Sequence, residues 1–365
     1  MTVALVTPRY APAIGGVERV AEMEARELAR RGLDVELLTT DPTRSLPPIE
    51  RRDDVLVRRF PTVANDSVYF LSPWLGRYLA EHATEYSVLH AHSYHTPLAL
   101  QSALASRRRR VPFVVSTHYH GTGHSFVRRA LHVPYRPLGH WVLRTAARVL
   151  CVSSVEETLL RRHFGPRLET IVNPNAIDPD ELSVARASRS LGSARILSVG
   201  RLDAYKQPQR VVEALGHCAP DTTLTLVGDG PLRRTLEHST PGPGNRVRLL
   251  GQVSRAAVLD EYRNADVFVS LSRHESFGLA VLEAAVAGLP VVASAIPAHL
   301  ETAAYMPPGR IEFVDPDATG KDVAQAIRTA GQRGRVASVD GWPLPTWSRH
   351  VDLVQSAYVS AMERH

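Results

Sequence analysis

Short apolar runs alternate with helical patterns along the whole chain, and this alternation restricts the fold strongly. Apolar strands that are each followed by a helix are typical of a parallel sheet with helices on both faces. In the first half the predicted strands are Val3–Val6, Val35–Thr39, Ser87–His90, Phe113–Ser116 and Val149–Val152. In the second half they are Arg195–Val199, Thr223–Val227, Val247–Leu250, Val267–Leu271 and Pro290–Ala293. The sequence therefore predicts two doubly wound α/β domains.

A segment rich in proline, asparagine and aspartate, residues 173–179, separates the two series. We expect the link between the domains near residues 175–192, and motion about such a link is the default expectation. The expected domains are residues 1–180 and 181–345. The last helical pattern, within residues 346–365, either caps the second domain or crosses back to the first, and we favour the return to the first domain.

The ends and the cysteines of the chain bear on its compartment. Met1 leads directly into Val3–Val6, without the cationic start and long apolar core of a signal peptide. No apolar stretch reaches the ~18 residues that span a bilayer. Cys151 and Cys218 lie far apart in apolar or helical contexts, which is typical of free thiols, although a bridge between them stays an alternative. We therefore expect a cytoplasmic protein.

Basic residues concentrate in one part of the first half. From Tyr86 to Val155 there is no aspartate or glutamate. The same stretch contains nine arginines: Arg107, Arg108, Arg109, Arg110, Arg128, Arg129, Arg136, Arg144 and Arg148. Such a stretch produces a positive field. It is either the ordinary surface of an arginine-rich chain or a contact for an anionic acceptor or the inner face of an anionic membrane. No nucleic-acid-binding motif accompanies the charge, so nucleic acid is not an expected partner.

The segment of residues 272–285 is the most informative part of the second half. Ser276 is suited to cap the helix that the following apolar pattern predicts. The segment then lies at the C-terminal end of a parallel strand, where open α/β sheets bind ligands. Backbone N–H groups of Phe277, Gly278 and Leu279 would face a phosphate there, and the helix dipole would favour its charge. Gly278 would also let the ligand approach closely.

Two acidic residues, Glu275 and Glu283, flank the predicted helix start. With Glu283 about two turns inside the helix, the carboxylates would lie on the order of 10 Å apart. That separation suits a ribose and a hexose at opposite ends of a diphosphate. Glu283 has only apolar neighbours in the sequence and would otherwise be buried without a partner, which is costly. We assign Glu283 to the ribose and Glu275 to the transferred sugar, although Glu275 alone could be an exposed loop acid.

Two cations, Arg201 and Lys206, follow the predicted strand Arg195–Val199 and so belong to the same edge of the sheet. A departing nucleoside diphosphate gains negative charge, and cations at this position would stabilise it. Lys206 is one of only two lysines, beside Lys321, in a chain that otherwise uses arginine. A compact ammonium therefore indicates a steric requirement, and a solvated surface lysine is the alternative.

The spacing Glu275-x7-Glu283 within Ser-x-x-Glu-Ser-Phe-Gly-Leu resembles the signature of the retaining, GT-B-fold glycosyltransferases of family 4, or glycosyl transferases group 1. Further segments match this family in the same order along the chain: Asn173–Asp178, Val199–Asp203 with Lys206–Gln207, and Gly228–Pro231. The resemblance implies two Rossmann-like domains that face a cleft, with the nucleotide-sugar donor held by the second domain and the acceptor by the first. It also implies that the backbone of Val253 contacts the base.

The first half offers a second set of candidate residues. Gly15 and Gly16 open a predicted helix and could present N–H groups to a phosphate or sugar, but a glycine pair alone is as easily a turn. The resemblance implies that both face the donor, that His118 contacts the transferred sugar, and that His92 lines the cleft. The alternative for His118 is a histidine bonded within the sheet edge.

Histidines gather near two predicted strand ends: His90, His92 and His95, and then His118, His120 and His124. A zinc site is the alternative interpretation, but neither cysteines nor a His-Glu-x-x-His helix accompany them. We expect no metal and no cofactor. Arg201, Lys206 and the helix start already supply the positive charge that the departing diphosphate needs.

We thus expect a metal-independent hexosyltransferase that uses a UDP- or GDP-sugar, and the resemblance implies that it retains the anomeric configuration. Its acceptor would be a glycan, a lipid-linked molecule or a small natural product. One rival is a glycan phosphorylase or nucleotide-sugar epimerase of the same fold. A pyridoxal-dependent phosphorylase needs a Schiff-base lysine, for which only Lys321 remains. The other rival is a catalytically silent module that binds sugar nucleotides or membranes.

Overall fold

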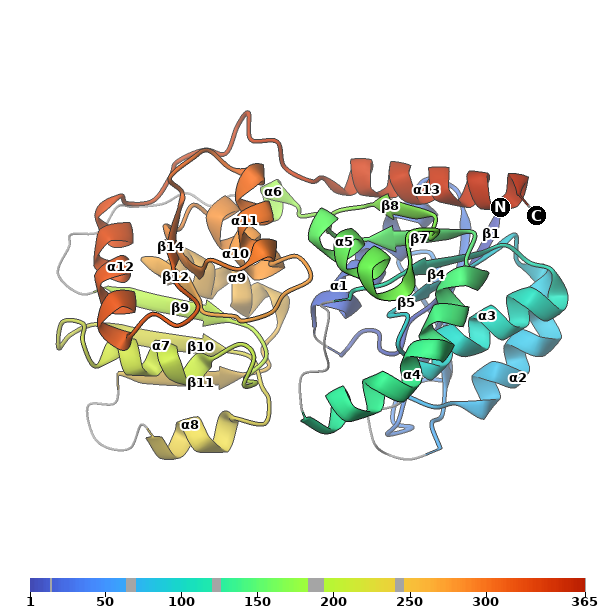
Figure 1. The fold of residues 1–365 in the computed structure, drawn as a ribbon, viewed down its shortest axis with the longest axis horizontal. Helices are drawn as coiled ribbons and strands as arrows, with labels where there is room; N and C mark the ends of the chain where they lie inside the picture. The colour runs from blue at the N-terminus through green and yellow to red at the C-terminus, as the bar shows by residue number, and fades with distance from the viewer. Residues whose placement is uncertain (14, 64–69, 120–125, 183–193, 240–245, 365) are drawn as a thin grey trace. The chain divides into compact units, whose positions relative to one another are not determined.

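The computed structural model describes residues 1–13, 15–63, 70–119, 126–182, 194–239 and 246–364, and only the backbone for 126–135. The chain divides into two compact units, one of Met1–Ala176 with Pro345–His365 and one of Ile177–Leu344. Each unit is a sheet with helices on both faces, as Figure 1 shows. The two-domain α/β fold predicted from the alternating pattern is confirmed.

The first unit is built on a sheet with the strand order β3-β4-β2-β1-β5-β6-β7-β8. The strands are β1 (Thr2–Val6), β2 (Asp34–Thr40), β3 (Ile49–Arg52), β4 (Val55–Phe60), β5 (Val88–His92), β6 (Phe113–Ser116), β7 (Arg148–Cys151) and β8 (Thr170–Val172). All neighbours pair in parallel except β3 and β4, an antiparallel pair at the edge that the sequence pattern did not predict. The strand order reverses between β1 and β5, which makes their carboxyl ends a topological switch point.

Helices cover both faces of this sheet. They are α1 (Gly16–Arg30), α2 (Pro73–His82), α3 (Pro97–Arg109), α4 (Phe126–Thr145), α5 (Ser154–Phe164) and α13 (Trp347–Glu363). Helices α2 to α5 pack on one face, and α1 and α13 share the other. Helix α13 contributes the buried residues Val351, Val354, Ala357, Tyr358 and Ala361, which recur at helical spacing. The predicted return of the C-terminal helix to the first domain is therefore confirmed.

The second unit has the strand order β11-β10-β9-β12-β13-β14, and its strands pair in parallel throughout. The strands are β9 (Arg195–Val199), β10 (Thr223–Val227), β11 (Val247–Gly251), β12 (Val267–Ser270), β13 (Val291–Ser294) and β14 (Ile311–Val314). Numbered within the unit, this is the 3-2-1-4-5-6 order of dinucleotide-binding sheets. Its switch point lies between β9 and β12.

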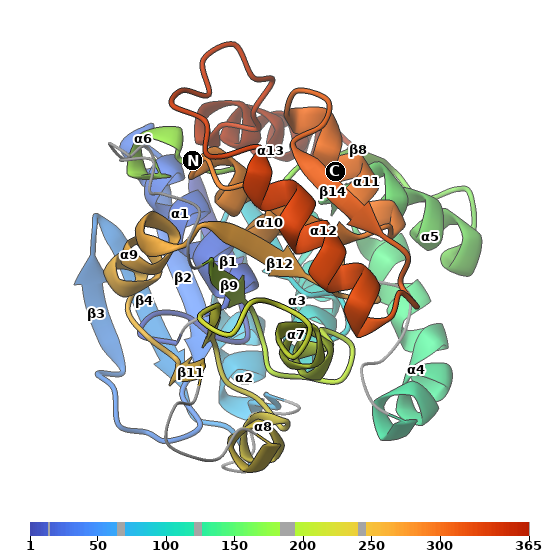
Figure 2. The same cartoon turned by 90° about the vertical axis from the view of Figure 1, so that its left-hand side faces the viewer.

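The helices of the second unit are α6 (Pro179–Leu182), α7 (Pro208–Leu215), α8 (Arg233–Ser239), α9 (Arg255–Asn264), α10 (Leu279–Val286), α11 (Pro297–Thr302) and α12 (Gly320–Gln332). Helices α7 and α12 pack together against one face, with α12 across β12 to β14 (Figure 2). Helix α10 contacts β12 and β13, and α9 contacts β9. Because every strand of this sheet runs the same way, the loops that follow β9, β11 and β12 share one edge.

Candidate functional site

The loops after β9 and β12 meet at the switch point of the second unit, where Lys206 and Glu275 form an ion pair. The side chains are only 22% and 15% exposed, and the Ser272 hydroxyl donates to Glu275 at 2.8 Å. Burial opposes the charge on both groups, yet the ammonium of Lys206 lowers the pKa of Glu275 and Glu275 raises the pKa of Lys206. Both groups are therefore charged, and the structure brings these two predicted residues together.

Arg201 lies in the same loop as Lys206 but does not join the pair. Its side chain is 48% exposed, and its Nε lies 3.3 Å from Asp203 Oδ2. The backbone of this loop is fixed by the next one, because a Cβ on Gly228 would lie 2.0 Å from the carbonyl oxygen of Gly200. The glycine after β10 thus lets the two loops pack backbone to backbone, which positions Arg201 and Lys206.

Helix α10 begins later than the sequence suggested. Gly278, with a φ of 97°, is the N-cap residue, and no side chain caps the helix, so the assignment of Ser276 as N-cap was wrong. A Cβ on Gly278 would lie 3.0 Å from His299 Cδ2 and 3.2 Å from Thr302 Oγ1. The glycine is therefore needed for its left-handed conformation and for packing against α11. Leu279 is the first helical residue.

Only the backbone of Phe277 is a candidate for ligand binding at this edge of the sheet, because its side chain is buried. The side chain is buried, with its ring centroid 5.8 Å from that of Tyr305. The carbonyl of Phe277 accepts a hydrogen bond from the Thr302 hydroxyl. Its N–H group, next to Ser276 and Gly278, remains a candidate for binding an anion.

Glu283 has protein partners, so the argument that it would be buried alone was wrong. Its carboxylate lies 2.7 Å from Arg255 Nη1 and accepts from the Tyr262 hydroxyl at 3.2 Å. Burial raises the pKa of Tyr262 well above its usual range, and Glu283 raises it further, so the phenol stays protonated and donates. Despite burial, the carboxylates of Glu283 and Glu181 raise the pKa of Arg255. Because α10 starts at Leu279, Glu283 lies one turn into the helix instead of two.

Arg255 and Tyr262 are site residues that the sequence analysis missed, and both belong to α9. Val253 lies two residues before Arg255, in the loop between β11 and α9, and is half-buried. The Arg255–Glu283 pair therefore ties the loop that contains Val253 to helix α10. The signal that could have found Arg255 is the demand of a buried carboxylate for a cationic partner.

In the first unit Gly15 and Gly16 begin helix α1. Gly15 is the N-cap residue with a φ of 175°, extended backbone that any residue adopts. Gly16 is the first helical residue, and a Cβ there would meet nothing within 4 Å. A Cβ on Gly15 would lie 2.2 Å from Glu18 Oε2, the end of a side chain that can move, so the backbone conformation itself requires neither glycine. The predicted role of both glycines facing the donor stays a prediction.

His118 follows β6 and is buried beside His92. Its Nε2 lies 3.2 Å from His92 Nδ1, and the two rings stack with centroids 5.5 Å apart. Burial lowers the pKa of His118 well below its usual range, so the imidazole is neutral. His92 was expected after the strand but lies inside β5, together with His90. His120 and His124 lie outside the described residues.

His90 and His92 share one side of β5 and face Glu24 of helix α1. Burial alone would raise the pKa of Glu24, but the two imidazoles hold it well below its usual range. Burial lowers the pKa of His90. Glu24 was not predicted as a functional residue, although a glutamate on the otherwise apolar inner face of α1 was a visible signal.

Two family models match the chain. The model described as Glycosyltransferase Family 4 matches residues 14–181, and the model described as Glycosyl transferases group 1 matches residues 184–331. The first covers the unit with His118, and the second covers the unit with Lys206, Glu275 and Glu283. The chain belongs to the family 4 glycosyltransferases, also described as glycosyl transferases group 1.

Known relatives agree with this assignment. The glycosyltransferase is 30% identical to a D-inositol 3-phosphate glycosyltransferase of Geodermatophilus obscurus, over 96% of this chain and 85% of the relative. Among solved structures, sucrose-phosphate synthase of Thermosynechococcus elongatus has a TM-score of 0.71 at 22% identity, covering 100% of this chain and 97% of the other. HepE of Anabaena in complex with UDP and glucose has a TM-score of 0.71 at 20% identity, with coverages of 100% and 98%. At these identities the solved structures show the GT-B fold.

Among the helices in the described part of the glycosyltransferase, none is long and apolar enough to cross a membrane.

Proposed function

We propose that this glycosyltransferase moves a hexose-type sugar from a nucleoside-diphosphate sugar, with UDP or GDP as the nucleotide, to an acceptor hydroxyl with retention of configuration. The observation that carries the proposal is the charged Lys206–Glu275 pair at the switch point between β9 and β12. Open parallel sheets bind nucleotides at this point. The start of α10, where no side chain caps the backbone N–H groups, lies on the same loop as Glu275.

Each candidate residue of the second unit has a distinct role in this proposal. Lys206 and the N–H groups of residues 277–279 hold the diphosphate. Glu283 accepts hydrogen bonds from the ribose hydroxyls, while Arg255 and Tyr262 fix the direction of its carboxylate. Glu275 accepts hydrogen bonds from hydroxyls of the sugar. When the donor binds, Arg201 leaves its ion pair with Asp203 and pairs with a phosphate oxygen instead.

The same residues account for charge development in the reaction. As the bond between the anomeric carbon and the phosphate oxygen breaks, its electron pair moves to the diphosphate, which Lys206 and Arg201 stabilise. The acceptor hydroxyl attacks the same face of the sugar and passes its proton to the departing phosphate. Cations of the chain supply the positive charge, so we propose that transfer needs no metal.

The names of the relatives support a nucleotide-sugar donor and a small phosphorylated acceptor. HepE was solved with UDP and glucose, which favours UDP as the donor nucleotide. The relative from Geodermatophilus is named for a phosphorylated inositol, which favours an anionic acceptor.

Donor screening tests the proposal. The melting temperature is measured with UDP-, GDP-, dTDP- and ADP-sugars, and the nucleoside diphosphate released from each is quantified with and without EDTA. We expect one nucleotide class to stabilise the protein and to be hydrolysed slowly, unaffected by EDTA. Stabilisation without any hydrolysis or transfer would favour a silent binding module instead. Absorbance of bound pyridoxal in the purified protein would favour the phosphorylase.

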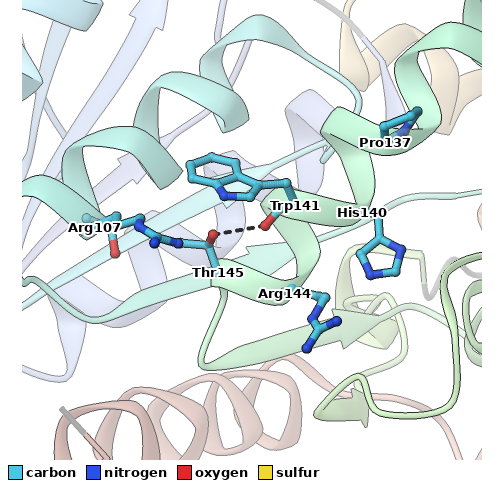
Figure 3. Close-up of a pocket in the computed structure, with 7 residues that line it drawn as sticks. Arg107, Pro137, His140, Trp141, Arg144 and Thr145 are labelled. Carbon is cyan, nitrogen blue, oxygen red and sulfur yellow. Dashed lines mark hydrogen bonds between the residues drawn. The ribbon is translucent and has the colours of Figure 1, made fainter.

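We also propose that the basic surface of the first unit contacts an anionic membrane. Arg107 of α3 and His140, Trp141 and Arg144 of α4 line a pocket of about 670 Å³ (Figure 3). Leu138 beside it on α4 is exposed. Cations next to an exposed leucine and an indole suit the interface of an anionic bilayer.

Vesicle sedimentation tests this contact. Wild-type protein should bind vesicles that contain phosphatidylglycerol and release them as salt is raised, since exposed charges are screened. The double variant Arg107→Ala with Arg144→Ala should bind less, whereas Arg51→Ala, which removes an exposed arginine from β3, should bind like the wild type. Equal binding to neutral vesicles, or binding that salt does not weaken, would refute the contact.

A further inference from the structure

A buried cluster in the first unit brings three ligand atoms together from two elements. Glu24 of α1 and His90 and His92 of β5 are all fully buried or nearly so. Glu24 Oε1 lies 3.1 Å from His90 Nδ1 and 3.4 Å from His92 Nε2. All three atoms fall within 4.8 Å of one another, a grouping that occurs once among the described residues.

Two of these three atoms make no well-aligned hydrogen bond. Glu24 Oε1 and His92 Nε2 are both buried, and within the described structure they contact each other, while Glu24 Oε1 also contacts His90 Nδ1. A buried polar atom without a partner is unfavourable, and native structures rarely keep one without a bound water or ion. For bonds of 2.0–2.1 Å, neighbouring ligands of tetrahedral zinc lie about 3.3 Å apart, close to the two separations observed.

The remaining polar atom of each ligand residue is held by a further side chain. These contacts are His90 Nε2 to Ser116 Oγ at 2.9 Å, His92 Nδ1 to His118 Nε2 at 3.2 Å, and Glu24 Oε2 to His350 Nε2 at 3.1 Å. When both strand histidines donate through these nitrogens, His90 Nδ1 and His92 Nε2 carry lone pairs on the side of the cluster, and that of His90 Nδ1 accepts from the Tyr358 hydroxyl, a hydrogen bond that an ion would replace. Outer contacts of this kind orient the ligands of metal sites.

A fourth polar atom comes from the C-terminal helix. The hydroxyl of Tyr358 lies 2.7 Å from His90 Nδ1. Tyr358 and His350 are both buried residues of α13, so this helix contributes two side chains to the cluster. The groups around the ligands therefore come from α1, β5, β6 and α13.

We propose that Glu24, His90 and His92 bind a divalent transition-metal ion, with zinc as the ion that suits two imidazoles and one carboxylate in a closed site. The ion is structural and stabilises the docking of α13 on the first domain. The ligands lie in a different unit from Lys206, Glu275 and Glu283, but His92 contacts His118, which the family resemblance places at the transferred sugar, so metal content and melting temperature, and not activity, are the readouts.

Metal reloading tests the site. The protein is stripped with a chelator, incubated with Zn²⁺ or Co²⁺, desalted, and analysed by inductively coupled plasma mass spectrometry. We expect about one equivalent per chain, a higher melting temperature than that of the stripped protein, and no such effect of Mg²⁺. Retention of no metal by the reloaded wild-type protein would overturn the proposal.

Variants locate the ion. Glu24→Gln and His92→Asn should each weaken metal binding by about tenfold or more. His82→Gln, which removes a partly exposed imidazole paired with Glu85 on the surface, is the matched control and should bind like the wild type. Undiminished binding by both ligand variants would place the metal elsewhere and refute the site. If these variants do not fold, the Co²⁺ spectrum of the wild-type protein decides, because a buried site of imidazole and carboxylate predicts strong four-coordinate bands, and weak six-coordinate bands would contradict it.

Discussion

Replacement of Glu283 by glutamine separates a structural role from a role in donor binding. The carboxylate lies 2.7 Å from Arg255 Nη1, and at an effective dielectric constant of about 20 two unit charges at that distance attract by roughly 6 kcal/mol. Desolvation offsets most of this attraction. Arg255 also keeps Glu181 at 2.8 Å and is partly exposed, so its charge is not left unpaired. We therefore expect Glu283→Gln to lower the free energy of unfolding by about 1–3 kcal/mol.

The kinetic effect of the same variant follows from the proposed contact with the ribose. A glutamine oxygen still accepts a hydrogen bond but without charge, which costs about 1 kcal/mol and raises the donor KM roughly fivefold. The contact exists in ground state and transition state alike, so kcat should change little. Urea unfolding and initial rates of nucleoside-diphosphate release measure the two effects.

Glu237→Gln is the matched control, because Glu237 pairs with Arg233 on the exposed face of α8, where solvent screens the pair and its contribution to stability is small. An unchanged donor KM together with lower stability would show that Glu283 is only structural. If neither quantity changes, both the ion-pair reasoning and the ribose assignment are refuted.

Three further predictions concern the same unit. Lys206→Ala should lower kcat by about 10²–10³-fold, measured as release of nucleoside diphosphate, and a rate near that of the wild type would contradict its role. Gly278→Ala should destabilise the protein by about 1–3 kcal/mol in urea unfolding, because φ is 97° and the new Cβ would press on His299; equal stability would show that α11 yields freely. Burial opposes ionisation of Glu275 and Asp266, but Lys206 lowers the pKa of Glu275 and Arg195 lowers the pKa of Asp266. Both carboxylates therefore stabilise the folded state at pH values above the ordinary carboxyl pKa. This stabilisation should disappear as the pH falls through the lowered values, and a free energy of unfolding that is flat over that acid range would contradict it.

The fold was predictable from the sequence because apolar strands in a parallel sheet are nearly continuous hydrophobic runs. Runs such as Val3–Val6 and Phe113–Ser116 had no other consistent explanation. The edge strand β3 was missed because its sequence, Ile-Glu-Arg-Arg, is polar and mostly exposed. Such a strand is defined by backbone pairing with β4 alone, which leaves no apolar pattern to read.

The candidate site was predictable where it depends on strand ends, and unpredictable where it depends on packing between helices. Lys206 and Glu275 meet because β9 and β12 are neighbours, which follows from the strand order of this fold. The Arg255–Glu283 pair and the cap at Gly278 depend on how α9 and α11 pack against α10. No local pattern encodes those contacts.

The cluster around Glu24 shows the same limit. The sequence places His90 and His92 at the end of one predicted strand, but Glu24 approaches from a helix 66 positions before His90. Contacts between residues this far apart require the sheet order and the orientation of α1, which the spacing of histidines does not contain.

If the loops after β9 and β12 hold the nucleotide sugar, loss of the Lys206 ammonium must weaken binding of the nucleotide. Isothermal titration of the wild type and of Lys206→Ala with the nucleoside diphosphate selected in the donor screen measures this. We expect one binding site per chain in the wild type, and an affinity about tenfold or more lower in the variant, because a charge-assisted contact to phosphate is lost. Equal affinities in the two folded proteins would show that these loops do not hold the diphosphate.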